Sequence, residues 1–95
     1  MIFEWDEAKA RSNRAKHGVS FEDAELVWND PLYAIFFDRL VGSEERWHAL
    51  GMVGPAVLLL VVHVYPAGDD EQVVRIISAR RATTHERRRY EHQAT

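Results

Sequence analysis

The sequence predicts an α+β fold, in which helices pack on a twisted, mainly antiparallel sheet. Two capped, helix-like stretches follow a short strand near the N-terminus, four strand-like segments follow them, and a third capped helix closes the chain. The expected order of elements is therefore β-α-α-β-β-β-β-α. Because 95 residues supply one hydrophobic core, we expect a single domain over residues 1–95.

The first strand and helix are predicted from local pattern and capping residues. Residues 2–5 alternate in character, as in a short strand. Asp6 can cap a helix that runs to about His17, where Gly18 provides a left-handed stop. One face of this helix is polar and consists of Lys9, Asn13, Lys16 and His17. The opposite side carries the small residues that we expect to pack closely, Ala8 and Ala15.

A second helix is predicted between Ser20 and Pro31. Ser20 begins a capping box in which Asp23 replaces the usual glutamate. The expected buried stripe consists of Phe21, Ala24, Val27 and Trp28. Asp30 precedes a proline and is therefore expected to end the helix.

Four strands are expected to follow in a meander. They cover residues 32–38, 46–53, 56–65 and 73–78, and turns rich in Gly, Pro, Ser and Asp separate them. Residues 56–65 are apolar on both faces, which predicts the central, doubly buried strand. Thr83 and Glu86 then form a T-x-x-E capping box that starts a third helix, ending near His92.

Composition excludes several classes of protein. The chain has no cysteine, which rules out disulfides and cysteine-based zinc sites. The first residues lack the basic and apolar regions of a signal peptide. The longest apolar run, residues 56–62, is far shorter than the ~20 residues of a membrane-spanning helix. We therefore expect a cytoplasmic protein with no membrane partner.

The net charge of −3 conceals an asymmetry along the chain. Residues 72–95 contain six arginines and two acids, whereas residues 1–71 contain six basic residues and thirteen acids. A basic C-terminal segment on an acidic body indicates a local anionic partner and disfavours indiscriminate binding of nucleic acid.

Three stretches of the chain together resemble one family. Residues 3–24 contain F-E-W-D-x-x-K and N-x-x-K-H-G-V-S-F-x-x-A, similar to the opening of BrnT toxins. Residues 75–83 read R-I-I-S-A-R-x-A-T and are followed by Glu86-Arg87 and Tyr90, which resembles the close of those toxins. Glu45-Arg46, before a strand that contains Gly51, is similar to their middle signature. The order and spacing of the three pieces make the resemblance specific.

The resemblance implies a RelE-like fold and a toxin that cleaves RNA and thereby stops translation. It also implies neutralisation by a BrnA-like antitoxin of the ribbon–helix–helix type, whose complex with the toxin binds operator DNA. The loop at residues 66–70 lacks the basic residue that some members carry there, so we expect no RNA contact from it. A basic antitoxin segment is expected to dock on the acidic stretch from Glu22 to Glu45.

RNA cleavage without a metal requires a proton acceptor, cations on the developing phosphorane and a proton donor. Arginine and histidine suit these tasks. Our candidates for catalysis are Arg80, Arg46, His17 and Arg81. Our candidates for RNA binding are Lys16, Arg75, His48, Arg87 and Arg88. No spacing typical of a metal site occurs among the five histidines, and no cofactor is expected.

Arg80 is the first choice, because it is expected to follow a strand beside the N-terminus of the third helix, which favours anions. Pairing with Glu86 or a carbonyl is its structural alternative. Arg46 and His48 share one face of a strand, which could place a cation and a proton carrier together. The same pattern is equally typical of an ordinary, solvent-facing side of an antiparallel sheet.

The other candidates also have structural alternatives. Adjacent residues point apart, so only one of Arg80 and Arg81 is expected to reach a common site. Arg75 lies within a strand and suits a cross-strand acid. Lys16 and His17 suit the C-terminal dipole of their helix. His63, among valines, is expected to be a core or edge histidine.

One other function stays open at this point: a non-enzymatic module that binds nucleic acid or a protein through the C-terminal arginine-rich helix. Convergence of Arg46, Arg80 and one of Lys16 or His17 on a common cleft would favour catalysis. Scattered or uniformly ion-paired side chains would favour binding.

Overall fold

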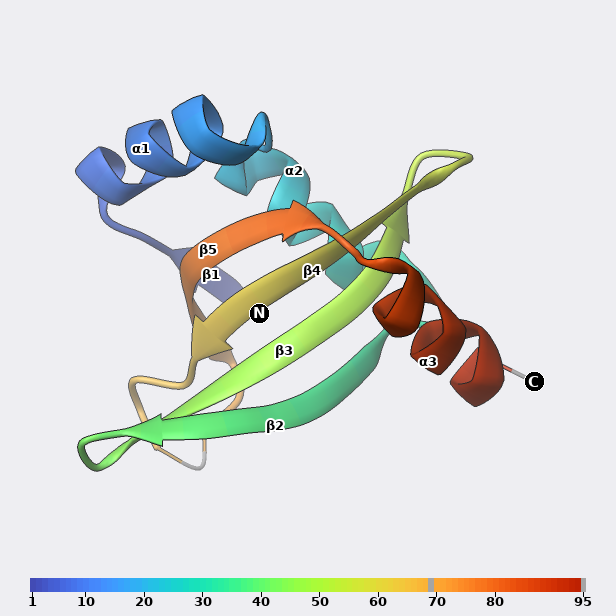
Figure 1. Ribbon diagram of the computed structural model, residues 1–95. Coiled ribbons are helices and arrows are strands. Elements are labelled where there is room, and N and C mark those ends of the chain that lie inside the picture. Colours follow the sequence, from blue (N-terminus) through green and yellow to red (C-terminus); the bar gives the residue numbers. More distant parts are fainter. Residues whose placement is uncertain (69, 95) are drawn as a thin grey trace.

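The computed structural model describes residues 1–68 and 70–94 and contains one five-stranded sheet (Figure 1). The strands are β1 (Ile2–Glu4), β2 (Ala34–Val41), β3 (Glu44–Val53), β4 (Val57–Val64) and β5 (Val73–Arg81). The helices are α1 (Glu7–His17), α2 (Phe21–Glu25), the 3₁₀ helix η1 (Leu26–Asn29) and α3 (Thr84–Ala94). The predicted α+β class, with helices packed on a sheet, is confirmed.

The sheet has the strand order β1-β5-β4-β3-β2 and is mixed. β1 pairs in parallel with β5, whereas the other three neighbouring pairs are antiparallel. Most of the chain separates β1 from β5, so no hairpin turn constrains this pair to be antiparallel.

The central position of β4 explains its composition. Leu58, Leu59, Leu60 and Val61 are each at most 2% exposed. Successive residues of a strand face opposite sides, so a strand that is covered on both faces is apolar at every position. The prediction of a central strand in this segment is confirmed.

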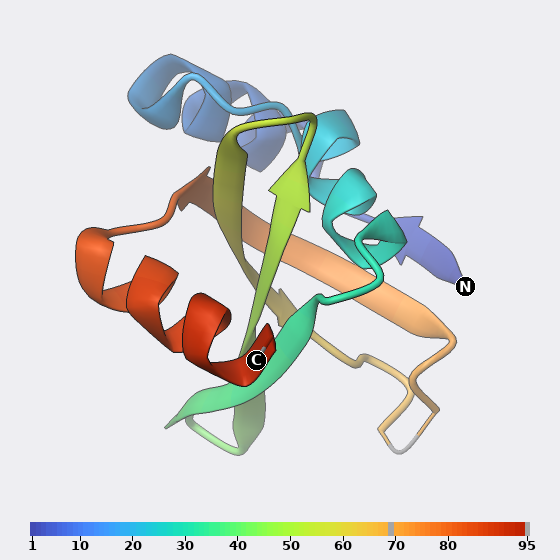
Figure 2. The same ribbon diagram turned by 90° about the vertical axis from the view of Figure 1, so that its right-hand side faces the viewer.

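Helices cover both faces of the sheet (Figure 2). On one face, α1, α2 and η1 pack over a core that includes Phe21, Ala24, Val27, Val61 and Ile76. On the other face, α3 contributes Tyr90 to a cluster with Leu50, Leu58 and Leu60. The predicted buried stripe of the second helix thus lies in the first of these clusters, with Trp28 packed at its margin.

The predicted helix caps are present. Asp6 accepts a hydrogen bond from the Lys9 backbone N–H, and Gly18 ends α1 with a φ of 70°. Thr83 and Glu86 form the reciprocal capping box of α3, each side chain accepting from the backbone N–H of the other residue. These local signals therefore placed two helices correctly along the chain.

The predicted packing side of α1 is wrong. Ala8 and Ala15 are exposed, whereas Asn13, assigned to the polar face, is only 7% exposed. β1 pairs with β5 only from Val73 to Arg75, so the β5 edge beyond that point has no strand neighbour. A buried amide on α1 provides hydrogen bonds there, and an alanine has none to offer.

Several boundaries differ from prediction, and β3 begins at Glu44 rather than at Arg46. The second helix tightens into η1 after Glu25, where Val27 packs directly on Gly51 of β3. β2 spans Ala34–Val41 rather than 32–38, with a register shift between Phe37 and Arg39. β5 continues to Arg81 instead of ending at Ser78, because its last residues pair with Leu59 and Leu60 of β4.

Candidate functional site

α3 covers only part of its sheet face, and the uncovered part forms a cleft of about 330 Å³. Its polar lining consists of Asp38, Arg39, Arg46, His48, Ser78 and Arg80, contributed by β2, β3 and β5. The strand register brings them together, because His48 pairs with Val62 and Val62 pairs with Ser78 across the sheet. Two of the predicted catalytic arginines, Arg46 and Arg80, therefore share one cleft with His48.

His48 has a carboxylate neighbour that the sequence analysis did not predict. Asp38 lies at the β2 register shift, and its Oδ2 is 3.3 Å from His48 Nε2. The same oxygen accepts a hydrogen bond from Arg39 Nε at 3.1 Å. A carboxylate in this position orients the imidazole. A bulge cannot be recognised from an alternating strand pattern, so the sequence carried no signal for this contact.

Arg46 enters the cleft from β3 with its guanidinium partly neutralised. Its Nε and Nη2 each lie 3.3 Å from Glu44 Oε1, and its side chain is 26% exposed. Glu44 itself is 48% exposed. An ion pair with such an exposed partner contributes little to stability, and the guanidinium can readily exchange the carboxylate for a phosphate oxygen.

Arg80 lines the cleft and also forms the ion pair with Glu86 that was its predicted structural alternative. Its Nη1 and Nη2 donate to the two carboxylate oxygens of Glu86 at 2.8 and 2.9 Å. This bidentate bond raises the pKa of Arg80 and lowers that of Glu86 to about 2. The expectation that Arg80 follows its strand is wrong, because β5 extends through Arg81. The paired guanidinium is held at the junction of β5 and α3 in a fixed direction.

Lys16 and His17 line a neighbouring, shallower cavity of about 200 Å³. Lys9 and Ser12 of α1 also line this cavity. The two cavities share Ile77 and Ser78 of β5 as a common wall. Polar and basic groups of α1 thus continue the cleft across β5, although Lys16 and His17 do not line the same cavity as Arg46.

The remaining candidates lie elsewhere. Arg81 faces the opposite side of the sheet, in a cavity that also includes Gly18 and Asp23. Arg75 pairs with Glu4, its neighbour on β1, at 3.0 Å, as its structural alternative predicted. Arg87 and Arg88 lie on α3 and line neither the cleft nor the cavity beside it.

The sequence analysis did not predict Arg39 and Ser78 at the cleft, nor the contact that Arg89 makes with the sheet. The Arg89 guanidinium lies 3.6 Å from the centroid of the Phe36 ring, a cation–π contact that ties α3 to β2. A run of three arginines on a helix gives no indication of which one faces the sheet. Which arginine faces the sheet depends on how α3 packs.

His63 is a buried, fully hydrogen-bonded histidine. Its Nδ1 donates to the Val61 carbonyl and its Nε2 accepts from the Tyr65 hydroxyl. Burial lowers the pKa of His63 to about 4. The imidazole is therefore neutral at physiological pH, which agrees with its predicted place in the core.

Within residues 1–68 and 70–94, no group of three or more potential metal-ligating side chains comes together. In the same described part of the chain, no helix is long and apolar enough to cross a membrane.

Comparisons with known proteins identify the family. A family model described as the ribonuclease toxin BrnT of type II toxin–antitoxin systems matches residues 5–86. The crystal structure of the Brucella abortus ribonuclease toxin BrnT is similar, with a TM-score of 0.60 and 23% sequence identity. That match covers 88% of this chain and 100% of the Brucella chain, and at this identity it shows the shared fold. A search of curated proteins gave no match. The chain belongs to the BrnT family of ribonuclease toxins of type II toxin–antitoxin systems.

Proposed function

We propose that this toxin is a metal-independent endoribonuclease whose active site is the cleft lined by Asp38, Arg46, His48 and Arg80. The observation that carries the proposal is the meeting of two arginines and one histidine in a single cleft. Together with Asp38 these side chains come from β2, β3 and β5, so the sheet fixes their relative positions.

The proposed reaction is attack of an RNA 2′-hydroxyl on the adjacent phosphate, with departure of the 5′-oxygen. His48 accepts the 2′-hydroxyl proton and passes it to the departing 5′-oxygen, and Asp38 positions the imidazole. Arg46 and Arg80 place positive charge on the phosphorane. Arg46 exchanges its exposed partner Glu44 for phosphate, whereas Arg80 acts from its fixed position beside Glu86.

The cavity on the other side of Ile77 and Ser78 gives the RNA strand a path. Lys16 and His17 contact the RNA backbone there, which assigns His17 to binding rather than to catalysis. Arg81 and Arg75 have no part in this scheme, because one lies on the other face and the other pairs with Glu4. Exposed Arg88 and half-buried Arg87 add positive charge on α3.

The finer properties that the family resemblance implies belong to the same proposal. They are a single toxin domain with a RelE-like sheet, a cytoplasmic location and inhibition of translation through RNA cleavage. The toxin is neutralised by a BrnA-like antitoxin of the ribbon–helix–helix type and contacts operator DNA only through their complex.

Two observations support the non-enzymatic alternative: Arg46 and Arg80 are both ion-paired, and Lys16 and His17 line a different cavity from Arg46. A module that only binds RNA would need no proton carrier. The contact between His48 and Asp38 therefore favours the catalytic proposal.

Single substitutions in the purified, antitoxin-free toxin test this proposal. Arg46→Gln and His48→Gln remove a cation and a proton carrier from the cleft, and Arg75→Gln is the matched control on the same sheet. RNA cleavage is timed first on free RNA in EDTA and then, without EDTA, in a translating extract, because ribosomes need Mg²⁺. We expect each cleft substitution to slow cleavage by about 100-fold or more and the control to change it less than about twofold. Salt-sensitive RNA binding by the wild type without cleavage in either setting would support the binding module instead.

A further inference from the structure

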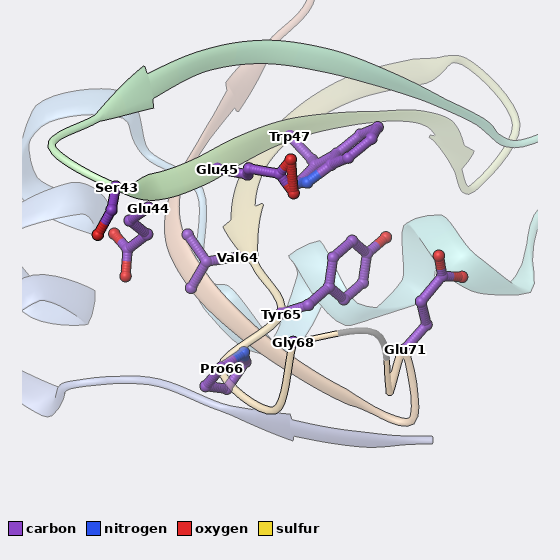
Figure 3. Close-up of a pocket in the computed structure, with 9 residues that line it drawn as sticks. All are labelled: Ser43, Glu44, Glu45, Trp47, Val64, Tyr65, Pro66, Gly68 and Glu71. Carbon is purple, nitrogen blue, oxygen red and sulfur yellow. The ribbon is translucent and has the colours of Figure 1, made fainter.

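A larger cavity, of about 610 Å³, lies on the other face of the sheet (Figure 3). It is bounded by the start of β3 and by the segment that leaves β4, through Trp47 and Tyr65 among others. Trp47 stands between Arg46 and His48 on β3, and successive residues of a strand face opposite sides. The sheet therefore separates this cavity from the cleft proposed for RNA.

The lining of this cavity is acidic. Glu45 and Glu71 contribute carboxylates, Glu44 lies at the lining but turns its carboxylate to Arg46, and no lysine or arginine is found among the described residues that line it. Glu44 is paired with Arg46, whereas Glu45 and Glu71 make no ion pair with any residue in the described part of the chain. Burial and the nearby charge of Glu71 raise the pKa of Tyr65 to about 12. A cation that enters the cavity would meet two carboxylates with no competing partner.

Aromatic rings complete the walls. Figure 3 shows the Trp47 ring on one side and the Tyr65 ring and Glu71 carboxylate on the other. The Trp47 and Tyr65 ring centroids are 6.1 Å apart, and Trp47 also contacts Phe37 edge-on at 5.3 Å. Rings beside carboxylates favour a guanidinium or ammonium group, through cation–π attraction together with ion pairing.

The surface continues beyond the cavity onto the edge strand β2. Phe37 and Leu40 are 49% and 60% exposed, and Leu40 is the register neighbour of Glu45. A free small cation would leave these apolar side chains in water. A polypeptide that places a basic side chain in the cavity can cover them at the same time, which is how an exposed apolar patch marks a protein interface.

We propose that this cavity and the adjoining β2 surface bind a segment of the antitoxin that carries an arginine or lysine beside apolar residues. The proposal rests on the toxin–antitoxin family but on none of the residues of the RNA cleft. It also moves the predicted docking site for the basic antitoxin segment. The acids that receive the segment are Glu45 and Glu71, and Glu22 and Glu25 of α2 lie outside the cavity.

The test compares two double substitutions that remove the same charge. Glu45→Gln with Glu71→Gln changes the cavity, and Glu22→Gln with Glu25→Gln is the matched control. Each purified toxin is titrated with the co-expressed, separated antitoxin in a calorimeter, after circular dichroism has established that it is folded. We expect the cavity pair to weaken binding by about tenfold or more and the control by less than about twofold.

Two further measurements distinguish antitoxin binding from RNA cleavage and from the binding of a small cation. RNA cleavage by both double variants should equal that of the wild type. If the wild-type toxin itself does not cleave RNA, the proposed function is refuted, but the comparison of antitoxin affinities still tests the present proposal. Arginine amide and spermidine, each added to the labelled toxin while the Trp47 indole NMR signal is followed, test a small-cation site. Unchanged antitoxin affinity in the cavity pair, or equal losses in both pairs, would overturn the proposal. A Trp47 response to a small cation combined with unchanged antitoxin affinity would assign the cavity to that cation instead.

Discussion

The side chain of Asn13 hydrogen-bonds both backbone groups of Ala79. Its Nδ2 donates to the Ala79 carbonyl at 2.8 Å, and its Oδ1 accepts from the Ala79 N–H at 3.1 Å. The Nδ2 also donates to the Val19 carbonyl at 3.0 Å. An amide on α1 thus takes the place of a neighbouring strand beside β5 and holds α1, with Lys16 and His17, at the edge of the proposed cleft.

Replacing Asn13 with aspartate should destabilise the toxin strongly. The carboxylate has the same shape but cannot donate, so it would face the carbonyls of Val19 and Ala79 without a proton. We expect a loss of about 3 kcal/mol or more in the free energy of unfolding, measured by urea denaturation. Ser12→Asp, at an exposed position of the same helix, should change it by only about 0.5 kcal/mol. Equal effects of the two substitutions would contradict this role.

The Arg80–Glu86 pair should make the stability of the toxin depend on pH in the acid range. Glu86 has a pKa lowered from 4.5 to about 2, chiefly by the bond from Arg80, so the pair stabilises the fold above pH 4.5. This stability is lost as the pH falls from about 4.5 through about 2. Glutamine at position 86 can still cap Thr83 but carries no charge. Glu86→Gln should therefore cost about 1 kcal/mol at pH 7 and flatten the acid dependence in this window. A variant with the same acid profile as the wild type would refute the assignment.

Buried His63 should make stability depend on pH in a different window. Its folded pKa of about 4 lies below the ordinary value of 6.5, so the unfolded chain takes up the proton first as the pH falls. The stabilisation is complete above pH 6.5 and is lost between there and pH 4. We expect the wild type to lose about 2 kcal/mol between pH 7 and pH 5 and His63→Gln to lose much less. Parallel denaturation curves for the two proteins at both pH values would argue against this.

Gly51 should not tolerate alanine. A Cβ at this position would lie 2.7 Å from Val27 Cγ1 and 2.8 Å from the Val27 carbonyl oxygen, where η1 rests on β3. The backbone oxygen cannot rotate away, so we expect Gly51→Ala to cost about 1–3 kcal/mol in thermal or urea unfolding. Gly54→Ala provides the contrast: its penalty of about 1 kcal/mol comes from its φ of 71°, with open space around it.

The sequence predicted those parts of the fold that depend on neighbouring residues. The Asp6 cap, the Gly18 stop and the Thr83–Glu86 capping box are local and lie where they were predicted. The burial of Asn13 depends on the length of β1, which ends after pairing with Arg75 and leaves the β5 edge open. No pattern within α1 indicates how long β1 is, so Asn13 was predicted to face solvent.

The candidate site was predictable to a similar extent. Strand alternation correctly placed Arg46 and His48 on one face and separated Arg80 from Arg81. Asp38 was missed because its approach to His48 depends on a register shift in β2. The ion pairs of Arg46 with Glu44 and of Arg80 with Glu86 join residues two and six positions apart. The sequence offered the second pair only as an alternative and gave no signal for the first.

The chemistry of the RNA ends tests the central claim most directly. Antitoxin-free toxin is incubated with free RNA in excess EDTA. Where free RNA is not cut, the toxin is incubated in a translating extract without EDTA, and in both settings the products are analysed by mass spectrometry. Attack by the 2′-hydroxyl in a cleft that uses His48 and arginines should give 2′,3′-cyclic phosphate and 5′-hydroxyl ends, and His48→Gln should lose them. Products with 5′-phosphate and 3′-hydroxyl ends, or cleavage of free RNA that EDTA abolishes, would contradict the account.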